Sequence, residues 1–345
     1  MAQAASRLAK QMKIAVVGAT GFLGREVLKA MDESELLLVE PLLLAEGEDV
    51  GEVLTCQGAD VTADNLEEAD FNGVHVALFC ADAATTRKYA PKAMQAGAMV
   101  IDACGAIRGE GVLLQSPEKL GKPDTLKEKG GVLPNPLAST LATVLGAIHE
   151  KSPLARAYVS TYQTVAGAGL GAVEEVAEQS VGLLGGAGEG GFSSERFAHQ
   201  AAFNVLPHVG EFADDGCTTT EKTIAEDFNA LFGELPLSVG CAYVPTFVGD
   251  AMDLALEFKG SAPGPEALRE MFSPASGVMV LDNPAENEYA TPYGAAETSY
   301  IFLSRVRRDP AHENGLRLWL VADHIRVAQA RVLVKYAEAI AHQMQ

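Results

Sequence analysis

The chain has 345 residues, of which 48% are apolar and 21% charged, enough for two globular domains of about 100–200 residues each. Its formal net charge of −20 excludes the nucleic-acid-binding proteins, because contact with a phosphate backbone needs clustered lysine and arginine. No run of about 18 apolar residues occurs, so a membrane-spanning protein is excluded as well.

The first residues and the cysteines predict a cytoplasmic protein. Residues 1–11 lack the apolar segment of a secretory signal. The cysteines are odd in number, scattered, and form no CxxC or Cys/His cluster, so we expect reduced thiols and no metal site. They are Cys56, Cys80, Cys104, Cys217 and Cys241.

The first part of the chain alternates short apolar runs with helical patterns. Continuous apolar strands separated by helices are typical of a parallel sheet whose two faces are both covered by helices. We therefore predict an α/β domain with the doubly wound sheet of the Rossmann type. The predicted strands are 13–17, 36–44, 74–79 and 98–101, and the predicted helices are 25–31 and 83–96.

The second part has longer strands with stretches of alternation, which is typical of a mixed or antiparallel sheet. A short strand at 131–133 and a helix at 139–149 lead into it. We predict a Rossmann domain at 12–138, completed by a C-terminal helix at 324–345, and an α+β catalytic and dimerisation domain at 139–323. The later strands are 157–165, 237–244, 252–258, 299–306 and 316–321, with helices at 172–184 and 221–232.

Three glycines with the spacing GxxGxxG join the first predicted strand to the first predicted helix. They are Gly18, Gly21 and Gly24. Glycine permits a tight turn, lets the backbone approach a pyrophosphate and packs the helix close to the strand, while the helix N-terminus attracts the phosphates. The sequence therefore predicts a nicotinamide dinucleotide site rather than a purely structural turn. Thr20, Phe22 and Leu23 complete this loop.

An acidic stretch follows the second predicted strand and bears on the choice of cofactor. A carboxylate such as Glu46 in this place accepts hydrogen bonds from the ribose 2′-hydroxyl of NAD and repels the 2′-phosphate of NADP. The cofactor is thus NAD or NADP, with NAD favoured. The same residues are equally consistent with a solvated acidic loop.

The chain resembles the aspartate-β-semialdehyde dehydrogenase family over residues 13–338, in seven segments that occur in order. The resemblance implies a Rossmann domain, a second catalytic and dimerisation domain, and a homodimer. For active members it implies NADPH-dependent reductive dephosphorylation of aspartyl-4-phosphate through a cysteine thiolate. The segments are VVGATGFLG, VIDACGAIR, LPNPLAST, STYQTVAGAG, AFNVLPHVGEF, GCAYVP and LWLVADHIRVAQARVLVKYAE.

The chain departs from that family where the chemistry is carried out. Ala138 stands at the position of the nucleophilic cysteine, at a helix start that would lower the pKa of a thiol. Tyr243 stands where the family has the arginine that binds the substrate carboxylate, and Asp250 stands where it has the histidine base. The nucleophile, the base and the substrate-binding arginine act as a unit, so the remaining groups cannot compensate for the loss of any one of them. These three losses therefore predict a protein without the family reaction.

Other positions keep the family pattern. Gln163 matches the glutamine that orients the reacting group, and Gly167 and Gly169 match the turn beside the nicotinamide. Arg108 and Lys222 match basic residues that hold phosphate, so a small anionic ligand is a further expected partner. Gln163 also fits a polar strand end, and the two basic residues also fit surface charges.

Three functions fit these residues. The first is a non-catalytic homologue, a dinucleotide-binding homodimer that senses the cofactor or scaffolds another protein. The second is an active NAD(P)-dependent oxidoreductase on a semialdehyde or another carbonyl, with Tyr243 and Asp250 as proton donors and Gln163 polarising the carbonyl. The third is the original amino-acid-biosynthesis enzyme with a relocated thiol, Cys104 or Cys241.

Overall fold

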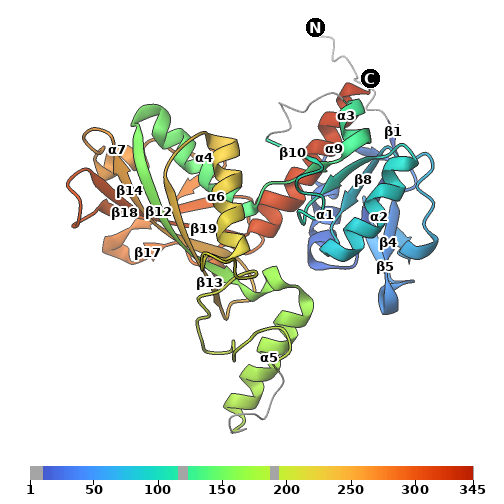
Figure 1. The fold of residues 1–345 in the computed structure, drawn as a ribbon, viewed down its shortest axis with the longest axis horizontal. Helices are drawn as coiled ribbons and strands as arrows, with labels where there is room; N and C mark the ends of the chain where they lie inside the picture. Colours follow the sequence, from blue (N-terminus) through green and yellow to red (C-terminus); the bar gives the residue numbers. More distant parts are fainter. Residues whose placement is uncertain (1–10, 116–122, 187–193, 345) are drawn as a thin grey trace. The chain divides into compact units, whose positions relative to one another are not determined.

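The computed structural model describes residues 11–115, 123–186 and 194–344, so residues 1–10 of the predicted signal-free start at 1–11 lie outside it. The described chain divides into two compact units, residues 1–134 with 329–345 and residues 135–328. Figure 1 draws both units as ribbons. No described helix has the length and apolar character needed to cross a membrane.

The first unit contains a seven-stranded sheet in which all neighbouring strands are parallel, in the order β10-β11-β9-β8-β2-β4-β7. The chain leaves the central strand β2 toward one edge and returns to its other side at β8, which is the strand order of a Rossmann sheet. The strands are β2 (Ile14–Val17), β4 (Leu42–Ala45), β7 (Asp64–Asn65), β8 (Val76–Phe79), β9 (Met99–Asp102), β10 (Val112–Leu113) and β11 (Gly131–Val132).

Helices cover both faces of this sheet, as the continuous apolar strands predicted. On one face α1 (Phe22–Asp32) and α9 (Arg331–Gln343) pack with Met12, Ile14 and Val16. On the other face α2 (Ala83–Gln95) buries Tyr89, Ala90 and Ala93. The unit also has α3 (Pro123–Lys129), the pair β1 (Gln11–Met12) and β3 (Leu37–Leu38), and the hairpin β5 (Val53–Cys56) and β6 (Ala59–Thr62).

The second unit is built on a six-stranded mixed sheet in the order β13-β12-β14-β19-β18-β15, so the predicted mixed sheet is confirmed. Its outermost pairs are parallel and its central pairs antiparallel. The strands are β12 (Leu154–Thr164), β13 (Leu237–Val244), β14 (Asp250–Phe258), β15 (Val278–Val280), β18 (Ile301–Arg308) and β19 (Gly315–Ala322).

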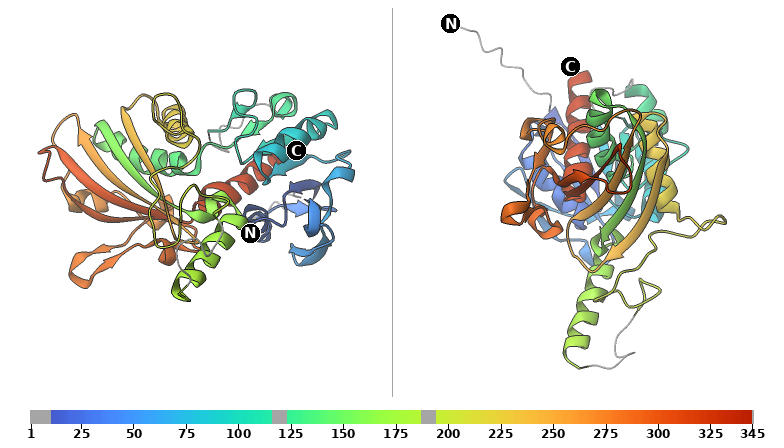
Figure 2. Two further views of the ribbon diagram at one scale, coloured as in Figure 1. Left: turned by 60° about the horizontal axis from the view of Figure 1, so that its bottom comes forward. Right: turned by 90° about the vertical axis from the view of Figure 1, so that its left-hand side faces the viewer.

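One face of the six-stranded sheet forms the main core of the second unit. There α4 (Pro136–Lys151) and α6 (Thr219–Phe232) bury residues such as Leu141, Phe228 and Leu254. The opposite face carries the small hairpin β16 (Asp282–Asn283) and β17 (Glu288–Tyr289) and α8 (Pro292–Ala295). Two further helices are α7 (Pro265–Arg269) and α5 (Leu170–Leu184), and α5 extends away from the sheet (Figure 2).

Candidate functional site

The glycine loop of the first unit has the geometry of a phosphate-binding turn. Gly18 directly follows β2 and has φ +79°, and its N–H donates to the carbonyl of Leu44 at 2.9 Å. A Cβ at Gly18 would come within 3.0 Å of the Ala81 backbone, so this close approach of two strand ends requires glycine. The loop thus lies where β2 and β8 end side by side, the point at which open α/β sheets bind ligands.

The two following glycines have different tasks. A Cβ at Gly24 would lie 2.2 Å from the carbonyl oxygen of Gly18, so Gly24 allows α1 to pack on the loop. Gly21 has an ordinary φ of −72° and room for a Cβ, and it is the N-cap of α1 without a side-chain cap. The first-turn N–H groups of α1 therefore lack a capping side chain, which suits a phosphate ligand. Thr20, Phe22 and Leu23 line the same turn.

The acidic stretch after β4 forms a short 3₁₀ turn, Gly47–Asp49. Thr20 donates its hydroxyl to Asp49 at 2.9 Å, and Thr85 donates to Glu46 at 2.7 Å. Arg25, on the first turn of α1, donates to both carboxylate oxygens of Glu52 at 2.6 and 2.8 Å. The surroundings of the loop are therefore acidic, and the guanidinium of Arg25 already has a carboxylate partner.

Ala138 lies in the first turn of α4 and is fully buried. The turn itself is well made, because the Asn135 side chain accepts from the Leu137 N–H at 2.9 Å and Pro136 begins the helix. The Asn135 N–H in turn donates to the buried Asp227 at 2.6 Å. A thiol carried here would gain from the positive end of α4, whereas the methyl group of Ala138 supplies only packing.

The structure brings Gln163, Tyr243 and Asp250 together at one end of the six-stranded sheet. Gln163 of β12 is in register with Tyr243 of β13, and the Thr164 N–H donates to Asp250 at 2.7 Å. Gln163 donates its amide to the Thr161 hydroxyl at 3.0 Å. These three predicted site residues are thus neighbours, although Gln163 and Asp250 both have structural partners.

Tyr243 has a packing role that an arginine would not fill in the same way. Its ring meets Phe197 edge to face at 5.3 Å, and its backbone pairs with Leu206. Burial, with the nearby Asp250 carboxylate, raises the pKa of Tyr243 to about 12. The phenol therefore stays neutral, so it can donate one hydrogen bond to a carboxylate but lacks the charge and the second donor of a guanidinium.

Sequence reasoning missed His324, which faces Asp250. Its Nδ1 lies 3.2 Å from Asp250 Oδ2, a distance that makes an ion pair if the ring is protonated. The ring is buried, and neither nitrogen has a hydrogen-bond partner within the described part of the chain. A histidine two residues after the strand that ends at Ala322 could have been noted in the sequence as a candidate site residue. Only the fold shows that it lies beside Asp250.

The remaining predicted residues are found in both units. Arg108, in the first unit, folds its guanidinium over Gly105. Lys222, near the start of α6, forms an ion pair with Asp215 at 2.9 Å, and this carboxylate raises the pKa of the lysine. Gly169 has φ +94° and precedes α5, and Gly167 lies in the exposed turn before it.

The two cysteines considered as relocated nucleophiles lie in surroundings that disfavour the thiolate form. Cys104 is exposed as a residue, but partial burial of its thiol and the Asp102 carboxylate raise its pKa to about 12, and the thiol donates to Asp102 at 3.0 Å. Burial raises the pKa of Cys241 to about 11. Both thiols are protonated at neutral pH, and a thiol is a far weaker nucleophile than a thiolate.

Two family models match the chain. The NAD-binding domain of semialdehyde dehydrogenases matches residues 13–129, and their dimerisation domain matches residues 145–327. The aspartate-semialdehyde dehydrogenase of Aquifex aeolicus is 37% identical over 336 residues, which cover 95% of this chain and 97% of that protein.

Solved structures of aspartate-semialdehyde dehydrogenases have the same fold as this chain. Aspartate semialdehyde dehydrogenase II of Vibrio cholerae, crystallised with ASA, is 29% identical and superposes with a TM-score of 0.87 over 97% of this chain and all of that one. The Candida albicans enzyme, solved with NADP, shares the fold at 17% identity with a TM-score of 0.68, over 96% and 98% of the two chains. The two matched domains, and the 37% identity to one aspartate-semialdehyde dehydrogenase over nearly the whole chain, show that the chain belongs to the aspartate-semialdehyde dehydrogenase family.

Proposed function

We propose that this chain is a homodimer that binds a nicotinamide dinucleotide and has lost the phosphorylating dehydrogenase activity of its family. The observation that carries the proposal is the fully buried methyl group of Ala138 in the first turn of α4. A thioacyl intermediate needs a sulfur nucleophile at that place, and a methyl group cannot form one. Measuring cofactor reduction by the wild-type protein with aspartate semialdehyde and phosphate tests this proposal.

The neighbours of Ala138 in the family pattern support the same conclusion. Tyr243 presents a neutral ring where a bidentate guanidinium would bind a substrate carboxylate. Asp250 adds negative charge where an anionic substrate and a developing oxyanion need positive charge. His324 brings an imidazole back to this end of the sheet, but its ring is buried against Asp250.

The alternative, hydride transfer to a carbonyl without a cysteine, has weaker support. It needs a proton donor, and the raised pKa of Tyr243 makes its phenol a reluctant one near neutral pH. Asp250 is already held by the Thr164 N–H and lies beside His324. We therefore place the binding function first.

We propose NAD rather than NADP as the preferred cofactor. Glu46 lies at the end of β4, with Glu48 and Asp49 in the turn that follows, and a ribose 2′-phosphate placed near this turn would meet their carboxylates. Arg25 is bound to Glu52 and is not available as a partner without breaking that pair. A carboxylate also accepts directly from the 2′-hydroxyl of NAD.

Calorimetry is expected to show tighter binding of NAD than of NADP to the purified protein. The Gly21→Asp variant should weaken the binding of either nucleotide by about a hundredfold or more, because its carboxylate would face the pyrophosphate. Its melting temperature should not fall, since Gly21 has room for a side chain and aspartate is a good N-cap. Tighter binding of NADP would refute the preference, and undiminished binding to Gly21→Asp would refute the site.

We propose that the homodimer forms through the second unit. That unit exposes large apolar side chains on α5 and on the segment that follows it, and such a surface is typical of a protein contact. Their exposed fractions are 73% for Val181, 79% for Leu184, 63% for Phe203, 54% for Val205 and 66% for Phe212.

Light scattering at micromolar concentration is expected to give twice the mass of the chain. Phe203→Asp should lower that mass toward the monomer, because a carboxylate in an apolar contact loses its hydration, and aspartate tolerates the positive φ of this residue. Val53→Asp, at a similarly exposed apolar residue of the first unit, should leave the mass unchanged. A monomer mass for the wild-type protein would end this proposal.

We propose a cytoplasmic location, because the five cysteines are all free thiols and a reducing compartment keeps thiols in that form. A role connected with amino-acid biosynthesis is a further part of the proposal, and it rests on the family alone.

A further inference from the structure

Four side chains form a row across one end of the six-stranded sheet. Tyr243 of β13 lies opposite Gln163 of β12. The antiparallel register of β12 with β14, extended by one residue, places Asp250 on the other side of Gln163. Side chains of residues that lie opposite one another in neighbouring strands share one face of the sheet. His324 continues the row, because its Nδ1 is 3.2 Å from Asp250 Oδ2.

The row lies on the face of the sheet that packs against α4 and α6. Cys241 and Met252 belong to the core under these helices, and they are two residues from Tyr243 and Asp250 along the same strands. Tyr243, Gln163 and Asp250 are partly exposed. The row is therefore at the rim of that core, within reach of a solute.

The hydrogen-bonding groups that the row leaves available are acceptors. Gln163 donates its amide N–H to the Thr161 hydroxyl at 3.0 Å, which leaves its carbonyl oxygen without a partner in the described chain. Asp250 accepts from the Thr164 N–H at 2.7 Å through one oxygen, and a carboxylate has further lone pairs to offer.

The imidazole of His324 adds a further acceptor. When the ring is neutral, its proton belongs on Nδ1, which faces Asp250, and Nε2 is then an acceptor. The ring is buried, and no described residue forms a hydrogen bond with Nε2. A buried polar atom in this state indicates that a partner is missing.

Charge at the row is negative. Among the residues that the structure describes, no lysine or arginine forms a hydrogen bond or an ion pair with its four members. Lys222, which the family pattern assigns to an anion, is paired with Asp215 at 2.9 Å. Beside a neutral His324 the carboxylate of Asp250 has no cationic partner, so it attracts a positively charged ligand.

Tyr243 adds an aromatic surface to this charge. Phe197 meets its ring edge to face at 5.3 Å, and Leu206 pairs with its backbone, so the ring is held in place. Burial and the Asp250 carboxylate raise the pKa of Tyr243 to about 12, so the phenol is neutral. The face of such a ring attracts a cation, and this attraction adds to that of Asp250.

We propose that the row binds the ammonium group of a small primary amine, which donates to Asp250 and to the carbonyl oxygen of Gln163 and lies against the ring of Tyr243. An ammonium group has three donors and no acceptor, so it matches the acceptors of the row. The inference rests on the function proposed above, in which the groups that bind and turn over an anionic substrate have been lost. It names the class of ligand that the second unit binds instead.

Three probes of equal carbon number separate charge from size. We would titrate the wild-type protein with propylammonium chloride, 1-propanol and sodium propionate at constant ionic strength and follow binding by calorimetry. A pH of about 8 keeps an ordinary imidazole neutral and an alkyl amine charged. We expect propylammonium to bind at least about tenfold more tightly than 1-propanol or propionate, because only the ammonium group forms charged hydrogen bonds with Asp250.

Two variants test the residues of the row. Asp250→Asn keeps an acceptor for the Thr164 N–H and removes the charge, so it should weaken propylammonium by about tenfold or more. Tyr243→Arg returns a guanidinium to the row and should reverse the preference, so that propionate binds more tightly than propylammonium. Glu266→Gln is the matched control for net charge, because this carboxylate of α7 is 85% exposed and lies outside the row, and binding should not change.

The outcomes separate this inference from the proposed function. Equal binding of the three probes to the wild type overturns the inference, and so does undiminished propylammonium binding by Asp250→Asn. If Asp250→Asn lowers the melting temperature, Tyr243→Arg decides, and an unchanged preference for propylammonium in that variant overturns the inference. Intact binding of NAD alongside any of these results leaves the proposed function standing. Phosphate-dependent turnover of aspartate semialdehyde by a protein that prefers propylammonium would overturn the proposed function alone.

Discussion

The Ala138→Cys variant is expected to show no phosphate-dependent oxidation of aspartate semialdehyde above background. The new thiol would lie in the first turn of α4, where the helix N-terminus favours a thiolate. The substrate carboxylate would still meet the phenol of Tyr243, and charged hydrogen bonds of the kind that a guanidinium supplies contribute about 1.5–3 kcal/mol each. Asp250 would still oppose the developing oxyanion.

The measurement for this variant is the absorbance of the reduced cofactor with aspartate semialdehyde and phosphate. A matched comparison adds Tyr243→Arg and Asp250→His to Ala138→Cys, which returns all three family groups to the chain. Turnover by the single variant would mean that the pocket around Ala138 is more intact than we argue. Its thermal unfolding must match the wild type, because Ala138 is fully buried and a larger side chain could strain the core.

The Asp282→Asn variant is expected to lose roughly 3–5 kcal/mol of unfolding free energy, the usual cost of breaking a buried ion pair. Asp282 accepts from Arg269 and from two backbone N–H groups, with no exposure to solvent. An amide would present N–H groups to one of these donors and leave Arg269 without its buried partner. Chemical denaturation with circular dichroism measures the change.

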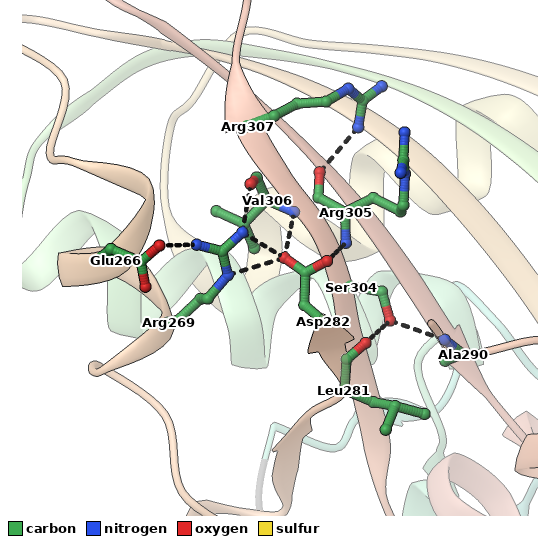
Figure 3. Close-up of polar contacts among 9 residues, drawn as sticks. All are labelled: Glu266, Arg269, Leu281, Asp282, Ala290, Ser304, Arg305, Val306 and Arg307. Carbon is green, nitrogen blue, oxygen red and sulfur yellow. Dashed lines mark hydrogen bonds and ion pairs between the residues drawn. The ribbon is translucent and has the colours of Figure 1, made fainter. Parts of the chain in front are cut away.

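A control for Asp282→Asn comes from Glu266, the second carboxylate partner of Arg269. Arg269 also pairs with Glu266 at 2.7 Å, and that carboxylate is 85% exposed. Glu266→Gln should therefore cost no more than about 1 kcal/mol, as exposed pairs do. Equal destabilisation by Asp282→Asn and Glu266→Gln would contradict this prediction. It would mean that the buried contacts of Asp282 shown in Figure 3 stabilise the protein no more than the exposed Glu266–Arg269 pair does.

Elements with strong local patterns could be predicted from the sequence. Continuous apolar runs predicted β2 and β8 of the parallel sheet, and β13 has the predicted bounds, 237–244. The hairpin of β5 and β6 was missed because its strands have only four residues each and most of their side chains are exposed. Local composition carries little signal for such an element.

Features that depend on contacts between distant residues could not be predicted. The pairing of His324 with Asp250 joins the start of the last helical segment to the first residue of β14. The β-bulge in β18 between Ser304 and Arg307 is another such feature, because the Arg305 N–H donates to Asp282, a residue of the separate strand β16. The glycine spacing, in contrast, is local, and for that reason the candidate dinucleotide loop was visible while the surroundings of Ala138 were not.

The most direct test of the central claim is the wild-type protein itself at an enzyme concentration comparable to that of the cofactor. Aspartate semialdehyde, phosphate and either NAD or NADP are mixed with it, and the absorbance of the reduced cofactor is followed, with the Aquifex aeolicus relative as the active control. We predict no reduced cofactor above the rate without enzyme, even within a single turnover, because Ala138 has no group that can form the thioacyl intermediate. Formation of reduced cofactor that depends on both phosphate and aspartate semialdehyde would contradict the claim that the family reaction has been lost.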